Sequence, residues 1–290
     1  MVRIKKYFSL PLLCILASMV IIQGGASLAK TLFPIVGPAG TTSLRLTFSA
    51  LILFLVFKPW KKRVSRSQLF TLMLYGFFLG GMNYLFYLSI ARIPLGIAVA
   101  LEFAGPLMVA LLSSRRALDL LWVVFAVLGL GCLLPLTELA APLDSWGIFF
   151  ALAAGACWAG YILFGQKASS DVHGGTAVSI GMLFAALLVV PIGVVQVGPS
   201  LLTGPVLSTG LAIAILSSAL PYSLEMIALK GLSRSTFSIL MSLEPVFAAL
   251  SGFLFLHEKL TSLQIFAIIL VIAASIGSSV SAKKKTLSPI

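Results

Sequence analysis

Charged residues are scarce in this chain. They make up 10% of its 290 residues, and only eight of them are Asp or Glu. A soluble domain carries about 25% charged residues, which cover much of its surface. Here 60% of the residues are apolar. A water-soluble fold is therefore excluded, and we expect the chain to lie in a lipid bilayer, where the solvent is hydrocarbon.

Histidine and cysteine are also rare, with two and three residues. His173 and His257 lie far apart in expected loops, and Cys14, Cys132 and Cys157 lie in apolar runs without a CxxC pair. We therefore expect neither a metal centre nor a disulfide framework. A Walker A motif and a readable Ser/His/Asp arrangement are both absent, so we expect no cofactor and no enzymatic activity.

The apolar residues fall into runs that are separated by charged or Gly/Pro-rich loops. This pattern predicts an all-α polytopic membrane protein with ten transmembrane helices and no soluble domain. The predicted helices cover residues 8–27, 40–57, 69–90, 95–113, 120–136, 146–165, 176–196, 206–228, 236–256 and 262–281. Arg3, Lys5 and Lys6, followed by Ser27-Leu28-Ala29, also fit a signal peptide, but a counterpart in the second half favours a retained first helix.

The net charge of +12 would suggest a nucleic-acid partner in a soluble protein. Here the basic residues lie between the apolar runs, so membrane topology explains them better. If the N-terminus is cytoplasmic, sixteen of the 20 Lys and Arg residues lie in cytoplasmic segments and three in external loops, with Arg45 inside a helix. The positive-inside rule therefore predicts that both termini are cytoplasmic.

The two halves of the chain resemble one another. With a shift of 139 residues, "PLMVALL" at 106–112 falls on "PVFAALS" at 245–251, and "GGMNYLFYLSI" at 80–90 falls on "ALPYSLEMIAL" at 219–229. We predict a first five-helix repeat over 1–139 and a second over 140–290. Because five is odd, the second repeat enters the membrane from the opposite side. In such inverted repeats the substrate site is expected near the midplane of the bilayer.

Glu102 lies in the apolar stretch "GIAVALEFAGPLMVALL", about 12 Å into its predicted helix. A charge at the centre of a bilayer costs about 2.5–3.5 kcal/mol on insertion scales, so such a residue is a functional candidate. Pro106 cannot donate a hydrogen bond to the carbonyl of residue 102, and the helix is expected to bend there. A carboxyl beside a freed carbonyl would suit an ammonium group or a proton.

The second repeat carries a related arrangement. Glu244 precedes Pro245 in "SLEPVFAAL", and this proline is expected to free the carbonyl of Met241. The kink is therefore kept, while the carboxyl moves by three residues, which is nearly one helical turn.

Two other charged residues lie within the predicted helices. Arg45 is expected to form a structural ion pair, to pair with Glu102, or to bind a substrate carboxylate. Glu225 is another pathway candidate, but near the cytoplasmic end of its helix we favour the interpretation that it snorkels to the interface.

Polar and aromatic side chains provide further pathway candidates. They are as consistent with helix packing as with a cavity wall. Pro221 is expected to add a kink to the eighth helix. The candidates are Asn83, Tyr84 and Tyr87 in the third helix, Tyr222 in the eighth, Gln23 in the first and Trp158 in the sixth.

Several motifs resemble one family across nearly the whole chain. They are "IIQGGASLAKTLFPIVG", "GGMNYLFYLSI", "PLGIAVALEFAGPL", "AAGACWAGYIL" and "ILSSALPYSLEMIAL". With Arg in the second helix and proline in the fourth and ninth, they resemble the EamA-type repeats of the drug/metabolite transporter superfamily.

The resemblance implies a transporter of the bacterial inner membrane. It implies export of threonine, homoserine and related small amino acids, in exchange for protons. Because one fold serves many solutes, transport of another metabolite or a cationic drug remains an alternative. A membrane protein with a structural role and no transport is a further alternative.

Overall fold

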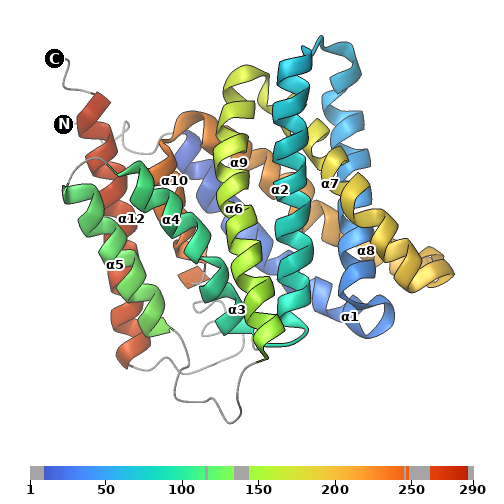
Figure 1. Ribbon diagram of the computed structural model, residues 1–290, viewed down its shortest axis with the longest axis horizontal. Helices are drawn as coiled ribbons and strands as arrows, with labels where there is room; N and C mark the ends of the chain where they lie inside the picture. Colours follow the sequence, from blue (N-terminus) through green and yellow to red (C-terminus); the bar gives the residue numbers. More distant parts are fainter. Residues whose placement is uncertain are drawn as a thin grey trace, which may run out of the picture. The chain divides into compact units, whose positions relative to one another are not determined.

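The computed structural model describes residues 10–93, 95–114, 117–133, 144–244, 246–247 and 262–286. Within these residues every regular element is helical (Figure 1). The helices are α1 (Leu10–Phe57), α2 (Arg66–Ile90), α3 (Leu95–Glu102), α4 (Ala104–Ser113), α5 (Ala117–Leu133), α6 (Ser145–Asp171), α7 (Gly174–Val197), α8 (Gly204–Ala214), α9 (Leu220–Gly231), α10 (Arg234–Met241) and α12 (Ser262–Thr286), with short helical turns at Pro59–Lys61, Gly198–Leu202 and Ile215–Ala219.

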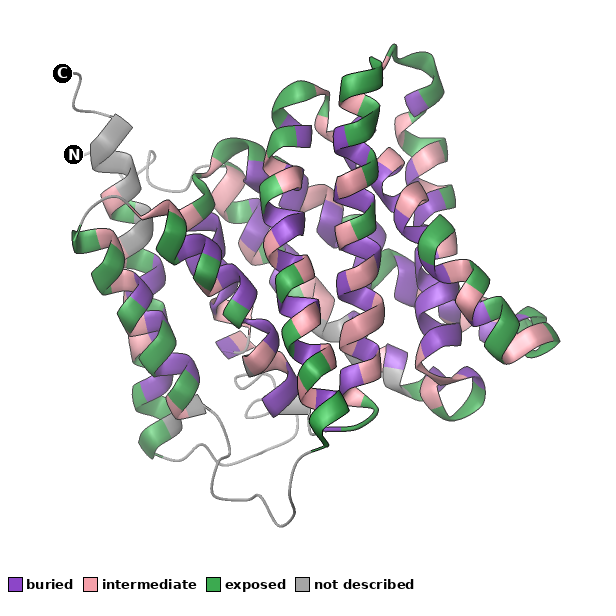
Figure 2. Cartoon of the chain, viewed as in Figure 1, coloured by how far each residue is buried: buried purple, intermediate pink, exposed green. Residues whose placement is uncertain are grey.

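Five helical segments of the described chain are long and apolar enough to cross a membrane. They are Thr31–Lys61, Arg66–Ile90, Ser145–Asp171, Gly174–Leu202 and Gly204–Gly231. Large apolar side chains such as Leu55, Leu112 and Val195 are exposed. Figure 2 marks exposed positions in green along the helices. Exposed apolar side chains in such number suit contact with lipid rather than with water. The prediction of an all-α membrane protein is confirmed.

The junction between the first two predicted helices differs from the prediction. In place of a loop after residue 27, α1 is helical from Leu10 to Phe57, and only Gly37 has non-helical angles, at φ 64° and ψ 178°. A positive φ is readily accessible to glycine because it lacks a Cβ atom. Pro38 then starts the following turn, where its missing N–H group costs nothing. A single residue therefore interrupts the helix where a loop was expected.

The described helices pack into two compact units. The first combines Met1–Gly81 with Phe164–Leu232, and the second combines Met82–Leu163 with Ser233–Ile290. Each unit draws on both predicted repeats, so the sequence repeats and the packing units divide the chain differently. α2 and α6 contribute residues to both units.

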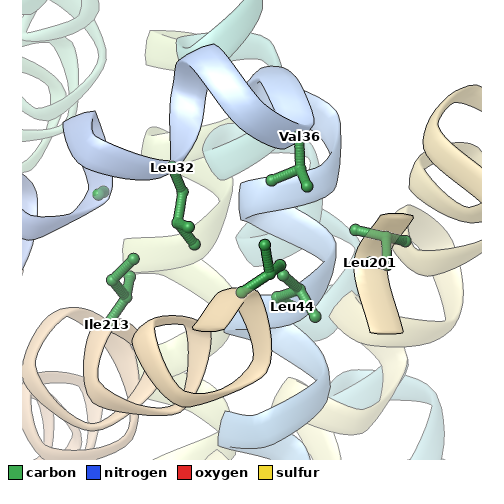
Figure 3. Close-up of a cluster of buried hydrophobic side chains, with 7 residues drawn as sticks. Leu32, Val36, Leu44, Leu201 and Ile213 are labelled. Carbon is green, nitrogen blue, oxygen red and sulfur yellow. The ribbon is translucent and has the colours of Figure 1, made fainter. Parts of the chain in front are cut away.

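Gly37 divides α1 into two arms, one before it and one after it. The first unit is organised around α1, which packs against α7, α8 and α9. One buried apolar cluster joins both arms of α1 to α8 and the turn before it (Figure 3). Its labelled members are Leu32, Val36, Leu44, Leu201 and Ile213. Hydroxyl groups add specific contacts, since Ser43 donates to the carbonyl of Val189 at 3.2 Å and Ser179 to that of Leu53 at 2.9 Å.

The second unit contains two apolar clusters. One joins α4, α5, α10 and α12, and α5 lies beside α12 (Figure 1). The other joins the end of α2, α3 and α6 through Ile93, Ile97, Ala98 and Ala151. Ser89 donates to the carbonyl of Gly147 at 2.9 Å and so ties α2 to the start of α6. This second cluster holds the helix that carries Glu102.

Gly37 provides a test of the α1 interruption. Replacing it with alanine, Gly37→Ala, should lower the free energy of unfolding by about 1–2 kcal/mol, because its φ is positive. Gly131 is a matched control, since it lies in α5 with open space around its missing Cβ. Gly131→Ala should raise stability by roughly 0.5–1 kcal/mol. Thermal unfolding of both variants in detergent checks this, and equal midpoints for the two would contradict the structure.

Candidate functional site

The helix that carries Glu102 is interrupted directly after this residue. α3 ends at Glu102, Phe103 forms a turn with φ −60° and ψ −16°, and α4 begins at Ala104 (Figure 1). The amide of Phe103 donates to the carbonyl of Val99 at 3.0 Å. Pro106 stands where the regular donor to the Glu102 carbonyl would be, and proline has no N–H group. The interruption therefore lies where the sequence predicts it.

Two glycines allow the backbone of α6 to contact the backbone at this interruption. A Cβ atom added to Gly155 would lie 2.5 Å from the carbonyl oxygen of Glu102. A Cβ atom added to Gly105 would collide with the carbonyl oxygen of Gly155. Because neither Gly155 nor Gly105 has room for a side chain, the backbone around Glu102 lies directly against the backbone of α6.

An aromatic pair lies beside this contact. Trp158 of α6 meets Phe103 edge to face, with ring centroids 4.8 Å apart. Both rings and the Glu102 side chain are buried. The second unit therefore holds a buried carboxyl group at a helix interruption, and the residue after it belongs to a buried aromatic pair. Carboxylates and aromatic rings are both groups that bind ammonium ions.

The candidates on α2 lie in the same unit. Asn83 and Tyr87 are both 6% exposed, and they share a helix face because they are four residues apart. Tyr84 is only half-buried. The structure therefore buries Asn83 and Tyr87 together and turns Tyr84 partly outward.

The helix that carries Glu244 has a matching interruption. α10 ends at Met241, Ser242 forms a turn with φ −64° and ψ −11°, and Glu244 follows in a half-buried helical position. Pro245 lies outside the described residues. Adding the repeat shift of 139 to the bounds of α3, 95 and 102, gives 234 and 241, which are the bounds of α10.

Arg45 lies in the first unit and is 6% exposed. One turn further along α1, Ser49 donates to the carbonyl of Ala214 at 3.0 Å. This segment of α1 therefore lies against the end of α8. Because Glu102 belongs to the second unit, the Arg45–Glu102 ion pair stays a prediction. Gln23 is in the described part of α1, but its side chain lies outside the described part of the chain.

Glu225 differs from the prediction. It is only 2% exposed, so the interpretation that it snorkels to the interface is wrong. It lies on the buried face of α9 together with Tyr222, Met226 and Leu229, and α9 packs against α1 and α7. Sequence position alone placed Glu225 near a helix end, but the rotation of the helix turns it inward.

The kink predicted at Pro221 takes a form that the sequence did not indicate. Residues Ile215–Ala219 form a π-helical turn between α8 and α9, and the amide of Leu220 donates to the carbonyl of Ile215. On α1, Gly25 lies against this turn, since a Cβ atom there would lie 2.6 Å from the Cβ of Ser217. The "QGG" motif could have indicated a close approach, but not its partner.

Within the described chain, no group of three His, Cys, Asp or Glu residues is arranged to hold a metal ion. The described chain combines apolar helices, helix interruptions and buried ionisable groups. This combination is typical of multi-pass membrane transport proteins.

The chain belongs to the EamA-like transporter family, whose pattern matches residues 145–280. It is 57% identical to "Threonine/homoserine exporter RhtA" of Escherichia coli (strain K12), over 96% of this chain and 94% of the relative. It is 56% identical to the protein of the same name from Salmonella typhimurium (strain SL1344), over 95% and 93%.

A crystal structure shares the fold, with a TM-score of 0.72 and 18% identity, over 93% of this chain and 98% of that one. The relatives are transporters and not enzymes. With the apolar helices, they confirm the prediction of a transporter of the bacterial inner membrane.

The contact between α6 and Glu102 leads to a prediction. Gly155→Ala should destabilise the protein by about 1–3 kcal/mol, because the new methyl group meets a backbone carbonyl that cannot rotate away. Gly174→Ala is the control, since its Cβ would meet only Met226 at an ordinary 3.4 Å. The midpoint of thermal unfolding in detergent measures both. An unchanged midpoint for Gly155→Ala would show that α6 does not contact Glu102 in this way.

Proposed function

We propose that the protein exports threonine, homoserine and related small amino acids from the cytoplasm, in exchange for protons and by alternating access. The relatives named for this activity share 57% and 56% identity with nearly the whole chain. Identity at this level over full length supports a shared substrate class far better than a shared fold does.

The matching helix interruptions support an inverted pair of five-helix repeats. α3 and α10 coincide after the shift of 139 residues, and each is followed by a turn residue with nearly equal angles. A shift of 135 residues places Gly40–Leu51 loosely on the start of α7, and it places Gly37 on Val172, which lies between α6 and α7. The family match at 145–280 lies within the second proposed repeat. The distribution of Lys and Arg supports cytoplasmic termini.

The observation that carries the proposal is the buried carboxyl of Glu102 at the break between α3 and α4. Burying a charge in a membrane protein is costly, and such residues mark substrate or proton pathways. At neutral pH an amino acid carries an ammonium group, which a carboxylate can bind. Alternatively, a proton can neutralise the carboxylate once the substrate leaves. Competition of substrate and proton for Glu102 would couple their movements in opposite directions.

Other buried groups complete the proposed pathway. Arg45 would bind the substrate carboxylate, because a guanidinium group matches a carboxylate through two parallel hydrogen bonds. Glu244 would bind the ammonium group or a proton in the second repeat, as Glu102 would in the first. The buried hydroxyl and amide groups of Asn83, Tyr87 and Tyr222 supply polar contacts along the way.

Glu102→Gln tests this proposal while keeping the size of the side chain. Efflux of threonine from preloaded cells should fall roughly tenfold or more, because a charge-assisted hydrogen bond to the ammonium group is lost. The remaining efflux should also lose its dependence on external pH. Efflux is measured at equal amounts of protein in the membrane.

Asp171→Asn is the matched control, since it makes the same carboxyl-to-amide change at an exposed residue at the end of α6. It should retain wild-type efflux and pH dependence. Wild-type efflux with wild-type pH dependence in Glu102→Gln would remove Glu102 from the mechanism.

A further inference from the structure

The π-helical turn at Ile215–Ala219 leaves backbone acceptors without their regular donors. The Leu220 amide is already bonded to the carbonyl of Ile215, five residues back. Pro221 would be the next donor, to Ser217 in an α-helix or to Leu216 in a π-helix, but it has no N–H group. Turns of this kind occur often at functional sites in helices. The turn therefore presents carbonyl groups that a ligand can use.

The hydroxyl groups around the turn are not equivalent. Ser217 donates to the carbonyl of Ile213 at 2.7 Å, and Ser223 donates to that of Ala219 at 2.6 Å. Ser218 is fully buried, and among the described residues its hydroxyl has no hydrogen-bond partner. Leaving a buried hydroxyl unpaired is costly, so such a group points to a missing ligand.

The turn lies in the same unit as Arg45, the proposed partner of the substrate carboxylate. Leu44 packs against Gly210, and Ser49 bonds to Ala214, so this arm of α1 runs beside α8 in the same direction. Arg45 lies one turn before the Ser49–Ala214 contact along α1, and Ser218 lies about one turn beyond it along the other helix. Arg45, the proposed partner of the substrate carboxylate, and Ser218 therefore lie on opposite sides of this contact, about 12 Å apart along the two helices.

We propose that Ser218 and the π-helical turn form the subsite for the hydroxyl group of the substrate. A cation would use only the acceptors of this site, and a carboxylate only its donor. A hydroxyl group uses both, because it accepts from the Ser218 hydroxyl and donates to a carbonyl near Pro221. Threonine and homoserine share this hydroxyl group. The inference rests on the proposed function and adds the residue that selects hydroxylated amino acids. Ser218 is fully buried in this structure, so binding there requires a second conformation in which the substrate reaches the turn.

Ser218→Ala tests the subsite. Uptake of threonine and valine into proteoliposomes is compared, because valine has a methyl group in place of the threonine hydroxyl. Homoserine and norvaline form a second pair of the same kind. The wild-type protein should prefer the hydroxylated member of each pair, since a site built for a hydroxyl group rejects an analogue that lacks it. In Ser218→Ala this preference should fall about tenfold.

Ser223→Ala is the matched control, because it removes a hydroxyl from the same helix that is already bonded within that helix. It should keep the wild-type preference. Equal loss of threonine and valine uptake in Ser218→Ala would overturn the inference, as it would show a packing role. If this variant does not fold, Ser218→Cys, a weaker hydrogen-bonding group, must show a reduced preference, and an unchanged one overturns the inference.

The outcomes separate the two proposals. A wild-type protein that transports threonine and valine equally well leaves the proposed function standing and removes the hydroxyl subsite. A wild-type protein that transports neither threonine nor homoserine removes both.

Discussion

Hydrocarbon offers no hydrogen bonds, so the backbone groups of a membrane-spanning segment must be satisfied by the protein itself. The described chain meets this constraint by being helical. It departs from regular helix at a few points, among them Gly37, the Glu102–Ala104 break and the Ile215–Ala219 turn. A proline follows each of these points within a few residues. Two of the polar groups with candidate roles in transport, Glu102 and Ser218, lie at such points.

Glycines of neighbouring helices lie against two of these helix interruptions. Gly155 allows α6 to lie against the Glu102 carbonyl, and Gly25 allows α1 to lie against the turn at Ser217. Such contacts bring two helix backbones together at points where the regular helical donors are missing, which only a residue without a side chain allows.

Much of this arrangement could be predicted from the sequence, because hydropathy sets helix length and proline sets the place of interruption. The break after Glu102 could be predicted from Pro106, and the family from short sequence motifs. The burial of Glu225 and the partners of Gly25 and Gly155 could not be predicted, because they depend on how each helix is rotated toward its neighbours. The unpaired hydroxyl of Ser218 shows the same limit, since "ILSSALPYSLEMIAL" contains three serines that look alike in sequence but differ in their hydrogen bonds.

The central claim is coupled export of hydroxylated amino acids through buried carboxyl groups. It is tested most directly by purified protein in proteoliposomes, with labelled threonine, homoserine and a panel of other amino acids and cationic drugs, with and without a proton gradient. The account predicts that threonine and homoserine accumulate against their own gradients when a proton gradient of the right direction is imposed, and that they exchange without one. Movement of the cationic drugs alone, or of no solute, would contradict it.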